Sequence, residues 1–227
     1  MNATLIRTAA AICLAIGFNT AAQAREDRQL WTGASASVGL GGKWRLSQDI
    51  VGRFSDNRNG LYEIETSTLL GYKLSKSVTL WGGYVHNPQY SEGDFQRLER
   101  RAREQITIDN FAEVGPGKLS GRLRMEQRFR EGEDTGWRAR PFLRFSMPLT
   151  KNGTTSLNLS NETFVNLNTT GFQRTSGVDR MRNLAAVTTK LNTTLSIEAG
   201  YLNQYGFVRD GDDTIDHIAH LALSTSF

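Results

Sequence analysis

The sequence predicts an all-β fold: a transmembrane up-and-down antiparallel β-barrel of 10–12 strands, preceded by a cleaved signal peptide. Apolar and polar residues alternate through most of the chain, short turns alternate with longer loops, and the amino terminus has an export pattern. The chain has 227 residues, 38% of them hydrophobic, and a mean hydropathy of −0.42, which excludes a bundle of transmembrane helices. Nearly balanced charge, +4 net, together with 11 Phe, 6 Tyr and 4 Trp excludes a disordered chain.

Residues 1–24 have the pattern of a signal peptide. Arg7 precedes an apolar core over residues 8–18, and Ala22-Gln23-Ala24 is a small-x-small cleavage site. The core is too short to cross a membrane as a helix. We therefore expect export, cleavage after Ala24 and one mature domain of residues 25–227. This domain has no thiol, because the single Cys13 lies in the removed segment.

Period-two alternation begins after residue 30. Over residues 119–130, for example, Leu123 and Phe129 share one face, while arginines and Glu126 occupy the other. Eleven runs of this kind are present, although single-chain bacterial barrels have an even strand number. Either 154–166 is not a strand or 25–30 adds one, and the prediction is 10–12. The expected strands cover 30–40, 43–54, 61–74, 77–87, 99–114, 119–130, 137–149, 154–166, 178–191, 193–206 and 215–227.

The connections fall into two length classes, which is typical of outer-membrane barrels with short periplasmic turns and longer outer loops. Short turns are expected at 39–42, 75–76, 115–117, 151–153 and 192. Longer polar loops are expected at 55–60, 88–98, 131–135, 167–177 and 207–214.

Amphipathic strands alone do not say which face of the barrel is apolar. A soluble, periplasmic, lipocalin-like binding barrel turns its apolar face inward, whereas a membrane barrel turns it toward lipid. Long strands, an excess of Arg over Lys (21 to 6) and a last strand that ends at Phe227 favour the membrane barrel, with Phe227 as an assembly signal. Aromatic residues near strand ends, with Trp81 on the other parity, suggest interfacial girdles. They are Trp31, Trp44, Trp81, Trp137, Tyr62, Tyr72, Tyr84 and Tyr201.

The polar face is rich in arginine and is expected to line the interior. A regular hairpin at 131–135 would put Glu126 opposite Arg140, with Arg128 facing Arg138 and Arg122 facing Arg144. A tight turn at 151–153 would put Glu162 opposite Phe142. Acids of the same inward parity occur on other strands as Asp49, Glu63, Glu65 and Glu198. The candidate lumen or ligand-binding residues are Arg122, Arg124, Glu126, Arg128, Arg130, Arg138, Arg140, Arg144, Glu162, Arg180 and Arg182.

Several segments resemble a bacterial outer-membrane family known only as domain of unknown function 2490. The most specific is Arg122-Leu-Arg-Met-Glu-Gln-Arg-Phe129, followed by Arg138-Ala-Arg140. Further matches are Arg144, Pro148-Leu149, Asn161-Glu-Thr-Phe-Val-Asn166, Asp179-Arg180 and the closing Phe227. The resemblance implies a β-barrel in the bacterial outer membrane and supplies no reaction.

Two interpretations of the interior remain open: a structural barrel filled by Arg–carboxylate ladders, or a narrow passage that prefers anions. A different class is an outer-membrane lipid or peptide hydrolase with a rim site at His86 or His217; His220 is expected in the lumen near Ser224. Asp210–Asp213 is expected to be a turn, and Arg97–Arg103 a solvated strand end or, alternatively, a contact with lipopolysaccharide phosphates.

We expect a monomer in contact with outer-membrane lipid, lipopolysaccharide and the barrel-assembly machinery. We expect no catalytic residue, metal, cofactor or nucleic-acid partner.

Overall fold

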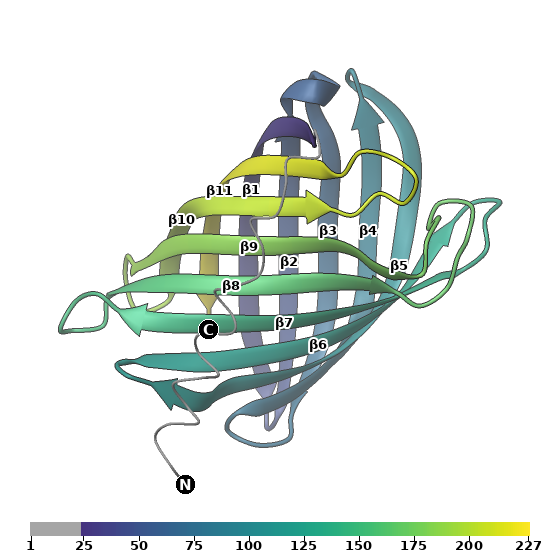
Figure 1. Ribbon diagram of the computed structural model, residues 1–227. Coiled ribbons are helices and arrows are strands. Elements are labelled where there is room, and N and C mark those ends of the chain that lie inside the picture. The colour runs from purple at the N-terminus through teal and green to yellow at the C-terminus, as the bar shows by residue number, and fades with distance from the viewer. Residues whose placement is uncertain (1–23) are drawn as a thin grey trace, which may run out of the picture.

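The computed structural model describes residues 24–227 and shows a closed barrel of eleven strands (Figure 1). The predicted signal peptide, Ala24 apart, lies outside the described residues. Within them, no helix is long and apolar enough to cross a membrane. The elements are β1 (Arg25–Gly41), β2 (Trp44–Ser55), the 3-10 turn η1 (Asp56–Arg58), β3 (Gly60–Lys73), β4 (Val78–Ser91), β5 (Asp94–Val114), β6 (Gly117–Arg130), β7 (Gly136–Pro148), β8 (Thr155–Asn166), β9 (Gly177–Lys190), β10 (Leu195–Gly206) and β11 (Thr214–Ser226).

The barrel closes through a parallel pair. Consecutive strands pair antiparallel throughout, and β1 then lies parallel to β11, with Arg25 beside Thr214 and Ser37 beside Ser226. An odd number of strands requires this closure, because each hairpin reverses the chain direction. The expected 10–12 strands are confirmed as eleven: residues 155–166 form β8, and residues 25–30 lengthen β1 instead of adding a strand.

The two ends of the barrel differ in their connections. One end, which we call the loop end, carries η1 and the loops 131–135, 167–176 and 207–213. The opposite end, the turn end, carries the connections 42–43, 74–77, 115–116, 149–154 and 191–194. In Figure 1 the loop end lies toward the upper right. Because β1 and β11 are parallel, β1 begins at the loop end and the chain finishes at the turn end with Phe227.

The prediction of a long loop at 88–98 is wrong. β4 continues to Ser91 and β5 begins at Asp94, so that only Glu92 and Gly93 connect them. Both have positive φ, 55° and 88°, as a two-residue hairpin turn requires. Tyr90 and Phe95 pack edge to face across this hairpin with ring centroids 6.1 Å apart, which favours strand over loop.

The apolar face of the barrel points outward. On β6, for instance, the side chain of Leu123 is exposed, with 48% of the residue's surface accessible, whereas Glu126 on the opposite face is fully buried. Large apolar residues are exposed in the same way on all eleven strands. This is the orientation that the sequence favoured over a soluble lipocalin-like barrel, which has its apolar face inside.

Two of the aromatic residues expected in girdles lie inside the barrel instead. Trp31 and Tyr62 are buried, and both donate hydrogen bonds to the side-chain oxygen of Gln29. These polar partners, and Arg53 stacked on Trp31, explain why aromatic rings are stable on the polar face. Trp81 also faces inward, as its parity predicted, and donates to Thr107. Exposed on the outside are Trp44, Trp137, Tyr84 and Tyr201.

Candidate functional site: the charged interior

A chain of alternating glutamates and arginines crosses the interior of the barrel. Glu126 on β6 is fully buried and accepts hydrogen bonds from three arginines of the neighbouring strands. These are Arg103 on β5, at 2.8 Å, and Arg138 and Arg140 on β7, at 2.6 and 2.9 Å. Three guanidinium groups around one carboxylate compensate its burial, because charge-assisted hydrogen bonds replace the lost hydration.

Bridging arginines connect Glu126 to carboxylates on other strands. Arg103 also contacts Glu65 on β3, at 2.9 Å, and Arg140 also contacts Glu162 on β8, at 2.8 Å. Arg101 joins Glu65 to Glu99 at 3.0 and 2.6 Å. The chain of contacts therefore runs from β3 and β5 through β6 and β7 to β8.

The network continues toward the loop end of the barrel. Glu99 is fully buried and also binds Arg128 and Arg130, at 2.9 and 2.6 Å. The loop 167–176 lies over these two arginines, with the ring of Phe172 stacked on both guanidinium groups. Gln173 is buried beside them: its side chain accepts a hydrogen bond from Arg128. This loop therefore covers the loop end of the charged interior.

Aromatic rings separate neighbouring guanidinium groups. Arg182 lies between Trp31 and Phe164, with 4.5 and 4.6 Å from its central carbon to the two ring centroids. Arg140 lies 4.3 Å from the same Phe164 ring, and Arg180 lies 5.7 Å from it. Stacking of this kind stabilises a desolvated guanidinium while its in-plane N–H groups stay available as donors.

The eleven candidate residues all lie on the inner face, but the β6–β7 register differs from the one expected. Glu126 pairs with Arg138, and Arg128 pairs with Gly136, a shift of two residues. The backbone N–H of Trp137 donates to the side chain of Asn168 in the loop 167–176, so a contact with this loop accompanies the altered register. The shift changes no residue's face, because side chains alternate with period two. Glu162 pairs with Phe142, as the tight turn predicted.

Four buried members of the network were not among the candidates: Arg53 on β2, which binds Glu65, and Glu99, Arg101 and Arg103 on β5. The three residues on β5 were expected in a solvated strand end or, alternatively, in contact with lipopolysaccharide phosphates; they are buried inside the barrel, so for these residues both expectations are wrong. Residues 99, 101 and 103 share one parity, and this alternation was the available signal. It was obscured because Arg100, on the opposite parity, is exposed on the outer face.

A cavity of about 400 Å³ lies beside the network. Arginines from β6, β7 and β9 line it, together with Glu162, Glu198 and the inward side of β1 and β11. Glu198 binds Arg144 and lies 3.4 Å from Nε2 of His220. His220 therefore faces the lumen as expected, with Glu198 rather than Ser224 as its partner.

The other two histidines lie on the outer face. Nδ1 of His86 is 3.4 Å from the hydroxyl of Tyr84, and Nδ1 of His217 is 2.7 Å from the hydroxyl of Tyr201. The neighbouring Asp216 faces inward and accepts a hydrogen bond from Gln204, so it does not meet His217. A hydrolase site at these histidines therefore has no acid partner from Asp216. Among residues 24–227, no three His, Cys, Asp or Glu side chains gather as metal ligands.

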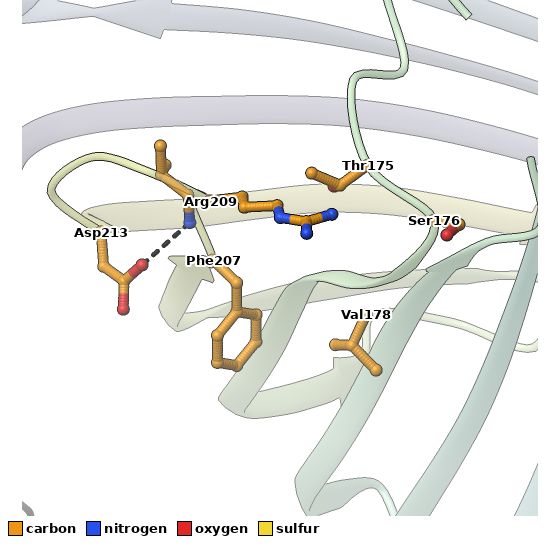
Figure 2. A pocket seen from close by; sticks show the side chains of 7 residues that line it. Thr175, Ser176, Val178, Phe207, Arg209 and Asp213 are labelled. Carbon is orange, nitrogen blue, oxygen red and sulfur yellow. Dashed lines mark hydrogen bonds between the residues drawn. The ribbon is translucent and has the colours of Figure 1, made fainter. Parts of the chain in front are cut away.

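A second, smaller pocket of about 260 Å³ lies at the loop end between residues 175–178 and 207–213 (Figure 2). Asp213 accepts a hydrogen bond from the Tyr205 hydroxyl and another, at 2.8 Å, from the backbone N–H of Val208. These bonds lower the pKa of Asp213 below its ordinary value of 3.8. Asp213 thus stabilises the turn expected at 210–213.

Comparison with known proteins agrees with the sequence resemblance. The family described as "Protein of unknown function (DUF2490)" matches residues 28–215. The chain belongs to this family. An uncharacterized protein of Methylorubrum extorquens is 32% identical over 219 residues, which cover 94% of each chain. No solved structure matches. Neither the family nor this relative carries an assigned reaction or ligand.

Proposed function

We propose that this protein is a monomeric integral β-barrel of the bacterial outer membrane, and that its interior is sealed by the Arg–Glu network. The observation that carries the proposal is the arrangement of the two faces: apolar side chains are exposed outside while ion pairs fill the inside. Lipid solvates an apolar outer face, and a closed barrel leaves no unpaired strand edge in the hydrocarbon. The predicted signal peptide supplies the route of export.

The strands are long enough for this location. Each has 12 to 21 residues, and about 9–11 tilted residues cross a bilayer. In the proposed orientation the turn end faces the periplasm and the loop end faces outward, toward lipopolysaccharide. Phe227 follows the last strand at the turn end, where the assembly machinery would read it. Its backbone pairs with Ser37 and Gly39 of β1, and its side chain is exposed.

The buried Arg–Glu network favours a structural barrel over an open passage. Glu99 and Glu126 are fully buried, and Arg101 and Arg103 nearly so, which shows that solvent does not reach these side chains at the middle of the network. Opening a passage there would require several buried ion pairs to separate, each at a cost of several kcal/mol.

Cell fractionation and electrophoresis test the location. We expect the mature chain in the outer-membrane fraction, extractable only with detergent, and migrating differently when unboiled. A chain that is freely soluble in water would overturn the proposal. In planar bilayers we expect no steady conductance from the wild-type protein.

A narrow anion-preferring passage is the second candidate, favoured by the arginine-lined cavity. It predicts a conductance whose ion preference reverses on exchange of Arg140 and Arg144 for Glu. A conductance with unchanged preference would show that ions take another path.

A further inference from the structure

The cavity beside the network has an unbalanced charge. Six arginines but only three carboxylates line it: Arg53, Arg122, Arg124, Arg140, Arg144 and Arg182 against Asp49, Glu162 and Glu198. Confined charges of one sign raise the local concentration of ions of the other sign. Arg53 and Arg140 also pair with Glu65 and Glu126, which lie outside the lining, so the excess positive charge that favours an anion is centred on Arg124.

Arg124 is the residue that most lacks a counterion. It is buried on β6, and its Nε donates to Gln105 at 2.8 Å. Within residues 24–227, no carboxylate oxygen lies within 4.0 Å of its guanidinium, whereas each of the other five arginines that line the cavity has at least one. A buried charge without a partner is costly, so Arg124 is a site at which an anion would contribute strongly.

Other donors on the cavity wall also lack acceptors. The Nε atoms of Arg122 and Arg140 are buried without a hydrogen-bond partner, and so is Nδ1 of His220. Arg122 is stacked on Phe142 at 4.6 Å and donates through Nη2 to Glu162, so its guanidinium plane is fixed and Nε remains the donor without an acceptor. A carboxylate or phosphate group carries two or more oxygens on one central atom, and two of these oxygens can accept parallel hydrogen bonds from one edge of a guanidinium group.

Part of the wall is apolar. Leu184 and Leu202 line the cavity, together with Ala222, and belong to the cluster formed with Trp31 and Ile218. A purely inorganic ion would leave this wall unused. An anion with a small apolar body fits both parts of the lining, and the volume lies within the range of small-molecule sites.

The cavity is accessible from the turn end. Arg144 lies near that end of β7, and its side chain is 34% exposed, whereas the side chain of Glu126 on the loop side is fully buried. Glu198, which binds Arg144, is also partly exposed. A solute would therefore enter from the side that the proposed orientation assigns to the periplasm.

We propose that this cavity binds a small organic anion, with its carboxylate or phosphate group against Arg124 and Arg122 and its apolar body against Leu184 and Leu202. The site is blind, since the Arg–Glu network closes its far side. The proposal goes beyond the proposed function, because it assigns a ligand class to the interior of a barrel that we propose to be structural.

Calorimetric titration of the full mature chain, refolded in detergent, tests the site. The probes are benzoate and phenyl phosphate, and benzamide is the neutral control of similar shape. We expect one or both anions to bind with a dissociation constant of about 1 mM or tighter, and benzamide not to bind. Arg124→Gln is expected to weaken binding at least about tenfold, because a charge-assisted bond is lost. Arg209→Gln, in the exposed loop 207–213, should leave binding unchanged.

Absence of binding by the folded wild-type protein overturns the proposal, as does equal binding of benzamide or full affinity in Arg124→Gln. Should Arg124→Gln fail to give the unboiled migration of the folded barrel, Arg122→Gln, which removes the other proposed contact of the anion, replaces it, with the same expected loss. Binding in detergent does not depend on where the protein resides. A negative result here therefore leaves the outer-membrane proposal standing, and a wrong location leaves the site standing.

Discussion

Replacing Glu126 by Gln tests the network most directly. The substitution keeps the shape of the side chain and removes the charge that three buried arginines share. Arg103 keeps Glu65 and Arg140 keeps Glu162, but Arg138 loses its one carboxylate partner among the described residues. Removal of one partner from a buried ion pair costs about 3–5 kcal/mol, so the free energy of unfolding should fall by about that amount.

Urea unfolding in phospholipid vesicles, followed by tryptophan fluorescence, measures this loss. The matched control is Glu113→Gln: Glu113 is 74% exposed and lies 3.8 Å from Lys118, so its removal should cost less than about 1 kcal/mol. In Glu126→Gln/Arg138→Gln the unpaired cation is also gone, and the double variant should be less destabilised than the sum of the single variants by about 1–3 kcal/mol.

Two results would refute this reasoning. One is a loss below about 1 kcal/mol in Glu126→Gln, which would mean that the carboxylate is not a buried, shared counterion. The other is strict additivity in the double variant, which would mean that Glu126 and Arg138 do not interact. Either result would also weaken the proposal of a sealed interior.

Three further predictions concern other parts of the barrel. In Gly71→Ala the new Cβ would lie 2.5 Å from the Trp81 ring, and we expect a loss of about 1–3 kcal/mol in the same urea assay; Gly82→Ala meets nothing within 4 Å and should not show this loss. Gln173→Ala removes the hydrogen bonds that hold loop 167–176 over Arg128, so trypsin should cleave at Arg174 faster than in the wild type, and an unchanged rate would contradict the covering role. The carboxyl of Asp213 should titrate below 3.8 by NMR, and Tyr205→Phe should raise the midpoint toward that value. Because the pKa is lowered in the folded state, the stabilisation of the loop by Asp213 is present above the unfolded-state pKa and is lost as the pH falls through the folded-state pKa. An unmoved midpoint in Tyr205→Phe would contradict the hydrogen bond from Tyr205 as the main cause of the lowered pKa.

The sequence alone determined most of the strands and the inner face of the eleven candidate residues. Alternation with period two is a local property, which made the expected strands 119–130 and 178–191 agree closely with β6 and β9. Glu162 opposite Phe142 was predictable as well, because a short turn fixes the register of its hairpin.

The sequence did not determine which side chains meet across the lumen. The register of β6 with β7 depends on the loop 131–135 and on contacts with 167–176, which are distant in sequence. Glu65 reaches Arg101 and Arg103 across an intervening strand, and Trp31 lies inside because Gln29 and Arg53 satisfy it there. Parity is set by neighbours along one chain segment, whereas charge pairing depends on how eleven strands close into a ring. For this reason the arginine-rich inner face could be read from the sequence, while the shared carboxylates, the unpaired Arg124 and the cavity required the tertiary structure.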